Sequence, residues 1–215
     1  MIRNLETHDW LMITSIFLML LLVTMRFLYE TRFSKLLSLT NMSEYFVEYK
    51  NRKNAFFSLF NALLLLYMLG VFSLFILIVQ AYLYKTELTF LNYLNSIEIF
   101  GLFVVGRYLI GKILSYFFEL NKIQGILSFV KFTYLSIIAL YLFPLSFLYI
   151  YGFHNVFFLW ISISSFVVFL LFFYIKILIT NQKLIFTNLF YFILYLCALE
   201  ITPLIYLYKL MILKV

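Results

Sequence analysis

Three ionisable residues lie inside long apolar stretches of the sequence, and they are the first candidates for chemistry. Glu98 and Arg107 share one stretch, and Glu200 lies in another. An ionised side chain within a membrane-spanning helix costs about 2 kcal/mol or more unless it is paired or hydrated. Such residues mark substrate pathways, proton relays or ion pairs, so each of the three needs a partner, water or a functional reason.

Arg107 and Glu200 form a candidate intramembrane ion pair. Arg107 is about 15 Å from the outer end of the predicted span Ile97–Phe118, and Glu200 is about 12 Å from the outer end of the predicted span Leu189–Tyr208. Although these two predicted helices run in opposite directions, both charges lie at a similar depth below the outer surface of the membrane. One interpretation is structural, because a buried pair neutralises both charges and fixes helix register. The other is a functional site for a substrate, a proton or a partner.

Other features of these two spans carry weaker predictions. Pro203 removes a backbone donor three residues after Glu200, so it is the predicted helix kink of the last span. Glu98 is near the outer rim of its span and is predicted to contact water. The span that contains Arg107 is made thin by three glycines, which predicts that it is the central helix of the bundle. These glycines are Gly101, Gly106 and Gly111.

The sequence predicts no catalytic, cofactor or metal site. Cys197 is the single cysteine, which excludes an internal disulfide and multi-cysteine metal motifs, and His8 and His154 are the only histidines. No zinc-binding helix motif, phosphate-binding glycine loop or glycine-flanked nucleophilic serine occurs. We therefore expect that the protein is not an enzyme and has no cofactor.

Composition predicts an all-α membrane protein. Hydrophobic residues make up 66% of the 215 residues, charged residues make up 12%, and the mean hydropathy is +1.05. In lipid each crossing must satisfy its own backbone hydrogen bonds, so apolar runs of about 20 residues are predicted to be helices. The whole chain, 1–215, is predicted to be a single bundle of six transmembrane helices. Their approximate limits are Trp10–Tyr29, Phe56–Tyr84, Ile97–Phe118, Ile126–Tyr149, Val156–Ile179 and Leu189–Tyr208.

The longest polar segment, 30–54, is predicted to be a cytoplasmic or interfacial loop. The spacing of Phe33, Leu36, Leu37 and Leu39 is compatible with a short helix that lies in the membrane interface. The segment ends in a basic collar that is expected to contact anionic lipids. The collar consists of Lys50, Arg52 and Lys53.

The distribution of basic residues predicts the orientation, because Lys and Arg are retained on the cytoplasmic side. With the N-terminus outside, four bases fall on the outer side and eleven on the inner side. The outer four are Arg3, Lys85, Lys209 and Lys214; the inner eleven are Arg26, Arg32, Lys35, Lys50, Arg52, Lys53, Lys112, Lys122, Lys131, Lys176 and Lys183. Both termini are therefore predicted to be periplasmic. The net charge of +7 is explained by these membrane anchors, so no nucleic-acid partner is expected.

The last predicted span carries a family resemblance. Its sequence, FYFILYLCALEITPLIYLYK from Phe190 to Lys209, combines Tyr195, Cys197, Glu200 and Pro203. This YLCALEITP-type signature resembles that of a Bacteroidota family of six-helix inner-membrane proteins known as a domain of unknown function. The resemblance extends more loosely over the whole chain, through six spans and a proline, Pro144, in the fourth. It implies a multi-pass protein of a bacterial inner membrane, in organisms that often carry the type 9 secretion and gliding apparatus, and it implies no activity.

Two functions are compatible with these features. The first is a non-enzymatic inner-membrane subunit, or an assembly or accessory factor, of an envelope complex linked to type 9 secretion or gliding motility. Its partners would be membrane lipids and other transmembrane subunits. The alternative is a small transporter or channel that uses Arg107 and Glu200 around a midplane cavity.

Overall fold

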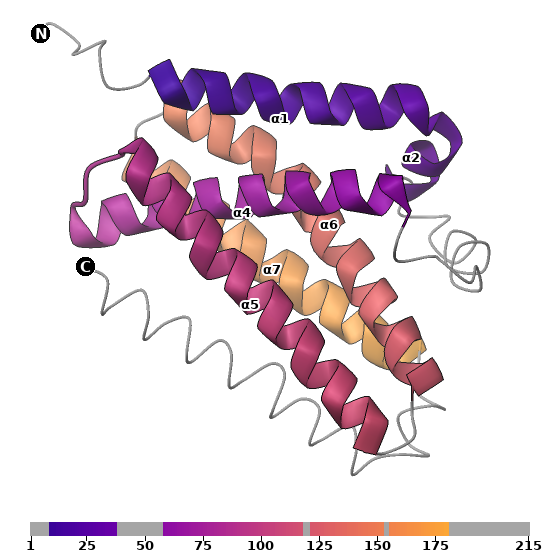
Figure 1. Cartoon of the computed structure of the whole chain (residues 1–215). Coiled ribbons are helices and arrows are strands. Elements are labelled where there is room, and N and C mark those ends of the chain that lie inside the picture. Colours follow the sequence, from indigo (N-terminus) through magenta and orange to yellow (C-terminus); the bar gives the residue numbers. More distant parts are fainter. Residues whose placement is uncertain (1–8, 38–57, 118–120, 153–154, 181–215) are drawn as a thin grey trace, which may run out of the picture.

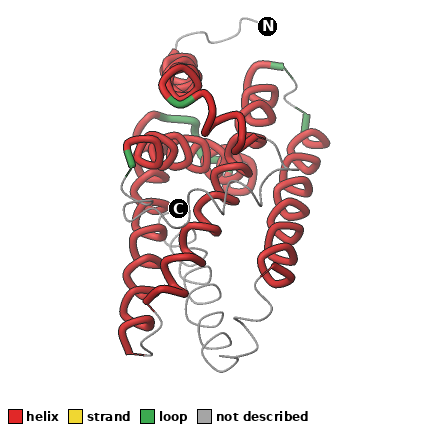
Figure 2. Tube along the Cα trace, turned by 90° about the vertical axis from the view of Figure 1, so that its right-hand side faces the viewer, coloured by secondary structure: helices red, strands yellow, loops and turns green. Residues whose placement is uncertain are grey.

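The computed structural model describes residues 9–37, 58–117, 121–152 and 155–180, and all of its regular structure is α-helix. Figures 1 and 2 show this part of the chain as long helices joined by short connections. The helices are α1 (Asp9–Leu28), α2 (Glu30–Leu37), α4 (Leu59–Tyr84), α5 (Phe90–Phe117), α6 (Asn121–Tyr151) and α7 (Val156–Thr180). The predicted all-helical class is confirmed.

Four of the described helices are long and apolar enough to cross a membrane. These are α1, α4, α6 and α7. The fifth long helix, α5, has 28 residues but is more polar, because Asn92, Asn95, Glu98, Arg107 and Lys112 lie along it. The sixth predicted span, Leu189–Tyr208, lies outside the described residues, as do Glu200, Pro203 and the collar Lys50, Arg52 and Lys53.

Helix ends follow local sequence chemistry. Ser58 caps α4 by accepting a hydrogen bond from the backbone N–H of Asn61, which satisfies one of the donors left free in a first helical turn. At the other end Lys85 adopts a left-handed conformation, with φ 53°, and the chain then enters α5 at Phe90. α5 starts seven residues before the predicted Ile97, because the polar residues at its beginning are helical too.

α4 and α6 form the centre of the described bundle. The apolar windows of α4 and α6 are 61% and 72% buried, whereas those of α1 and α7 are 28% and 17% buried. The prediction that the third span is central stays a prediction, because Gly111 is buried and the sixth predicted span lies outside the described residues. No described atom lies within 4 Å of a side chain built at Gly101 or Gly106, and Leu102, Val105 and Leu109 of α5 are exposed.

The glycine that does allow close approach is Gly70, in the middle of α4. A Cβ at this position would lie 2.6 Å from the Cδ2 atom of Leu18, so α1 packs directly against the α4 backbone here. Tyr93 of α5 donates a hydrogen bond to the carbonyl of Gly70 (3.4 Å), and its ring packs on Trp10 of α1. Small residues let membrane helices approach in this way.

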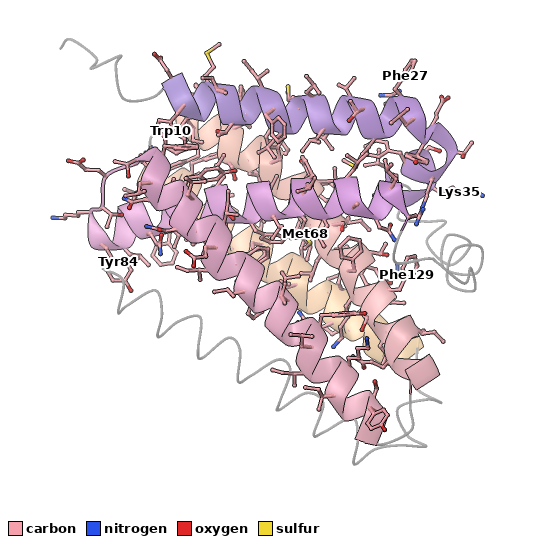
Figure 3. All side chains as sticks on the ribbon, in the orientation of Figure 1. Trp10, Phe27, Lys35, Met68, Tyr84 and Phe129 are labelled. Carbon is pink, nitrogen blue, oxygen red and sulfur yellow. The ribbon has the colours of Figure 1, made fainter. Side chains whose placement is uncertain are left out.

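Aromatic residues gather at one end of the described helices, which we call the Trp10 end. Trp10 contacts Phe90 and Tyr93 at the start of α5, and Figure 3 shows Trp10 and Tyr84 at this end, with Phe27 and Lys35 at the opposite end. We call the opposite end the α2 end. α4 runs opposite to α1, and α5, α6 and α7 alternate in direction among themselves but are steeply inclined to α1 and α4 (Figures 1 and 2). The predicted antiparallel packing therefore holds for α1 with α4 and for neighbours among α5, α6 and α7.

Candidate functional site: a basic cleft between α5, α6 and α7

Arg107 lines a small space between three helices. The space holds about 20 Å³, enough for one water molecule, and is lined by residues of α5, α6 and α7. The lining residues are Arg107, Lys131, Tyr134, Leu135, Ile138, Leu170, Phe173 and Tyr174. We call this space the basic cleft, because two of its lining residues are cations.

Lys131 is the residue of this site that sequence reasoning missed. It was counted among the anchors of the cytoplasmic face, yet its side chain is only 8% exposed and lies among buried residues of α6. Its Nζ atom is 5.8 Å from the ring centroid of Tyr174, within the range of a cation–π interaction. The sequence does contain a signal for its burial, because Lys131 has apolar residues on both sides in the run Phe129 to Phe132.

Arg107 and Lys131 lie at the same level of the bundle. Arg107 is ten residues before the end of α5, and Lys131 is ten residues after the start of α6, so each is about 15 Å from that end of its helix. Tyr174 is six residues before the end of α7 at Thr180. The basic cleft therefore lies between the middle of α5 and α6 and the end at which α5 is followed by α6.

Stacked aromatic rings join α6 and α7 at and beyond the cleft. Tyr134 and Phe173, which line the cleft, stack with centroids 4.6 Å apart, and Tyr141 stacks on Phe169 at 5.3 Å outside the lining. Tyr134 is buried, whereas Arg107 and Tyr174 are half-buried. The wall around the two cations is thus apolar, which strengthens electrostatic interactions, while the half-buried residues keep the space from being sealed.

A second buried cation, Arg32, lies at the α2 end but outside this cleft. Its guanidinium donates hydrogen bonds to Ser58 Oγ (2.9 Å) and to Asn61 Oδ1 (3.0 Å), and it lies 4.6 Å from the ring centroid of Phe60. Phe33 of α2 is buried beside it. The short helix predicted around Phe33 and Leu36 is therefore present as α2, and its buried face packs on the protein.

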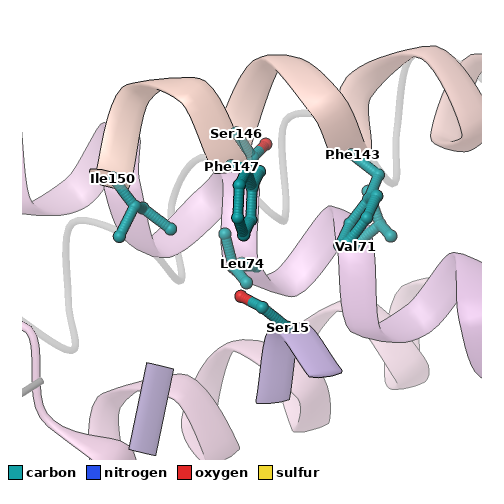
Figure 4. A pocket seen from close by; sticks show the side chains of 7 residues that line it. All are labelled: Ser15, Val71, Leu74, Phe143, Ser146, Phe147 and Ile150. Atoms are coloured by element: carbon teal, nitrogen blue, oxygen red, sulfur yellow. The ribbon is translucent and has the colours of Figure 1, made fainter. Parts of the chain in front are cut away.

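A narrow gap lies between α1, α4 and α6. It is too small for a water molecule and is lined by Ser15, Val71, Leu74, Phe143, Ser146, Phe147 and Ile150 (Figure 4). Ser15 Oγ donates to the carbonyl of Leu11, as serines in helices commonly do. Ser146 Oγ and the hydroxyl of Tyr67 are buried with no hydrogen-bond partner among the residues that the structure describes. The gap offers no room for a ligand.

Glu98 is exposed on α5 and is not among the residues that line the basic cleft, and its contact with water stays a prediction. Glu200, which was predicted to pair with Arg107, lies outside the described residues, as do Pro203, Cys197, His8 and His154. Within the described ranges no three histidine, cysteine or acidic side chains are grouped to hold a metal ion.

The long apolar helices, together with the bases buried between them, define the class: a polytopic α-helical membrane protein. Within that class the chain belongs to the family defined by a domain of unknown function, DUF4271, which matches residues 11–211 and so includes every helix described above. Comparison with curated proteins and with solved structures gives no match.

Proposed function

We propose that the protein is a non-enzymatic membrane subunit that assembles with transmembrane segments of other proteins in an envelope complex. The supporting observation is the unequal burial of its apolar helices. α1 and α7 are 28% and 17% buried, and both carry large exposed apolar side chains such as Phe17 and Phe172. Outside the long helices the described chain has only α2 and connections of a few residues. A partner would therefore contact mainly the flanks of the bundle within the membrane.

The proposal includes six spans, with both termini on the periplasmic side of a bacterial inner membrane. It is supported by the five long helices, by the apolar sequence Leu189–Tyr208, and by the excess of basic residues on the predicted inner side. Reporter fusions test it: a fusion within 32–53 should report a cytoplasmic location, and fusions at both termini a periplasmic one. A cytoplasmic C-terminus would contradict the six-span arrangement.

The choice of complex follows the family resemblance, which makes type 9 secretion and gliding motility the first assemblies to examine. The full chain, carrying an affinity tag, would be purified from native membranes in mild detergent. The proposal expects the same membrane proteins to be retained in several gentle detergents. Recovery of the chain alone in all of them would count against it.

Site-specific photocrosslinking makes this experiment sharper. A photoreactive phenylalanine analogue at Phe17 or Phe172 would face outward from α1 or α7, since these side chains are 57% and 53% exposed. The matched control is Phe75 of α4, which is 7% exposed. The retained partner should be crosslinked from one or both outer positions and not from Phe75. Equal crosslinking from Phe75 would mean that the capture is nonspecific.

The alternative function, a small transporter or channel, is favoured by one observation: Arg107 shares a space inside the bundle with a second cation, Lys131. Intramembrane charges commonly mark transport pathways. Purified protein in liposomes should then support flux of an ion or solute, and Glu200→Gln should abolish it. Sealed liposomes with no flux above protein-free controls would remove this alternative.

A further inference from the structure

α5 and α7 flank α6 on one side of the bundle, which we call the α5–α7 face. We propose that this face is the docking surface for the chain's own sixth predicted span, Leu189–Tyr208, which lies outside the described residues. The span would pack between α5 and α7, over the basic cleft, and run antiparallel to both. This inference goes beyond the proposed function and does not depend on it, because it concerns contacts within one chain, whereas the subunit role concerns contacts with another protein.

The first argument is the way in which the three helices meet. α5 and α7 each pack against α6, and neither packs extensively against the other. Phe72 of α4 lies between them, because its ring centroid is 5.0 Å from that of Phe100 on α5 and 5.9 Å from that of Phe166 on α7. Seven residues further along each helix, at Arg107 and Phe173, residues of α6 line the space between them. α5 and α7 are therefore kept apart by α4 at one level and by α6 at the other, so a further helix can lie between them.

The second argument is the place at which the chain leaves α7. The two stacked ring pairs described above show that residue numbers rise along α7 as they fall along α6. Thr180 at the end of α7 therefore lies at the same end of the bundle as the start of α6 and the end of α5, as Figure 1 shows. The eight residues 181–188 can extend about 26 Å, more than twice the roughly 8–10 Å that separates packed helices. The sixth span can thus begin beside the ends of α5 and α7 and return between them.

The third argument is the charge of the span, which matches the α5–α7 face in sign and level. Glu200 is the one residue between Leu189 and Tyr208 that is charged at neutral pH. It is 11 residues from Leu189, about 16 Å, and Arg107 is 10 residues from the end of α5, about 15 Å. Charged side chains within spans face the bundle interior or water and not lipid. The α5–α7 face gives Glu200 such an interior position, beside two basic residues of the cleft lining.

The single cysteine, Cys197, allows disulfide formation to test this placement in the full chain. Cys197 is three residues before Glu200, so the two share one side of a helix. Ile110 is half-buried on α5, three residues after Arg107, and shares its side in the same way. When the span runs antiparallel with Glu200 at the level of Arg107, its cysteine lies beside Ile110. Leu109 is the matched control, because it is on the opposite side of α5 and is 51% exposed.

Ile110→Cys and Leu109→Cys would be oxidised with copper phenanthroline in native membranes, and mass spectrometry of the linked peptides would quantify the disulfides. Ile110→Cys should give about tenfold more intrachain disulfide than Leu109→Cys, because the bond needs Cα atoms within about 7 Å and Cβ atoms that face each other. Equal yields in the two variants, or no intrachain disulfide in either, would overturn the placement and leave this face to lipid or to another protein. Disulfide-linked dimers of Ile110→Cys without the intrachain bond would also overturn it, since they would place a second copy of the chain there.

A second cysteine pair keeps the test decisive if Ile110→Cys prevents folding. In a Cys197→Ala background, Val104→Cys and Leu204→Cys lie about one helical turn from the two charges, on the side away from the first pair. They should form an intrachain disulfide. The control replaces Val104→Cys by Val105→Cys, since Val105 is on the opposite side of α5 and is 55% exposed. A disulfide from position 104 and not from position 105 would support the placement, and the reverse result or no disulfide from either position would overturn it.

Discussion

Two buried basic regions of the bundle differ in how their charges are held. At the junction of α2 and α4, Arg32 has two hydrogen-bond acceptors at 2.9 and 3.0 Å and a ring at 4.6 Å, and its side chain is 8% exposed. In the basic cleft, Lys131 is equally buried, but it shares with Arg107 a space large enough for a water molecule.

The difference separates a structural role from a binding role. Arg32 is surrounded by side chains of the helix it holds in place, so its position is fixed by the fold. The basic cleft combines two like charges with unfilled space and with half-buried residues that leave it open. Buried charges that are well packed fix the arrangement of helices, whereas charges beside unfilled space are the ones from which binding can be expected.

The largest expected effect tests whether the chain supplies its own anion to the cleft. If Arg107 and Glu200 pair, Glu200→Ala leaves an uncompensated charge and should lower the free energy of unfolding by about 3–5 kcal/mol, less if water reaches the site. The double change Arg107→Leu with Glu200→Leu should recover much of this stability. Unfolding in mild detergent, followed by circular dichroism, measures both.

Lys131 provides the control for this pair. The double change Lys131→Leu with Glu200→Leu should recover less stability than the Arg107 double, because it leaves the arginine without the glutamate. Equal recovery would mean that Glu200 interacts with both cations. An unchanged unfolding curve for Glu200→Ala would show that the predicted pairing is wrong.

The next effect concerns Arg32 at the junction of α2 and α4. Arg32→Ala removes two hydrogen bonds from a charged donor and a contact with the Phe60 ring, and it should cost about 2–3 kcal/mol of stability. Arg26→Ala, at an exposed position in the last turn of α1, should cost less than about 0.5 kcal/mol. Thermal unfolding monitored by size-exclusion chromatography compares them. Equal losses in the two variants would contradict the structural role of Arg32.

A smaller effect tests which helix is central. Gly70→Leu would place a side chain against Leu18 and should cost about 1–3 kcal/mol by overpacking. Leu18→Ala should relieve part of that cost in the double variant, which a double-mutant cycle measures. Gly101→Leu is the control on α5, where no described atom lies nearby, and it should change stability by less than about 0.5 kcal/mol. A larger loss at Gly101 than at Gly70 would place α5 against a neighbour outside the described residues.

Hydropathy predicted most helix limits well because long apolar runs leave few alternatives in a bilayer. The starts of α1 and α7 were predicted within one residue, whereas α5 begins seven residues early. The polar residues at its start, Asn92 and Asn95, reduce the hydropathy of the segment without preventing a helix. Composition shows how well a segment suits lipid. A helix can extend beyond the apolar segment wherever its backbone hydrogen bonds are satisfied.

The composition of the candidate site could not be predicted as well as its location. Arg107 was identified because a charge inside an apolar run is conspicuous, but Lys131 was assigned to the membrane surface by its distance from a predicted helix end. Its burial depends on neighbours from α7, such as Tyr174, which sequence spacing does not reveal. The same limit applies to the glycines, since a glycine brings two helices together only where a side chain of another helix packs against it, as Leu18 does at Gly70.

The smallest effect concerns two tyrosines of the core that differ in hydrogen bonding. The Tyr67 hydroxyl is buried and has no hydrogen-bond partner in the described part of the chain, whereas Tyr93 donates to the carbonyl of Gly70. Burying an unpaired hydroxyl costs about 1–3 kcal/mol, so Tyr67→Phe should raise stability by about 1 kcal/mol, and Tyr93→Phe should lower it by about 0.5–1 kcal/mol. Thermal unfolding of both variants in the same detergent measures these two changes in stability, which should have opposite signs. A loss of stability in Tyr67→Phe would show that this hydroxyl has a partner in the folded protein. If Tyr67→Phe raises stability but the partner no longer co-purifies, the Tyr67 hydroxyl serves assembly with the partner and not the stability of the chain itself.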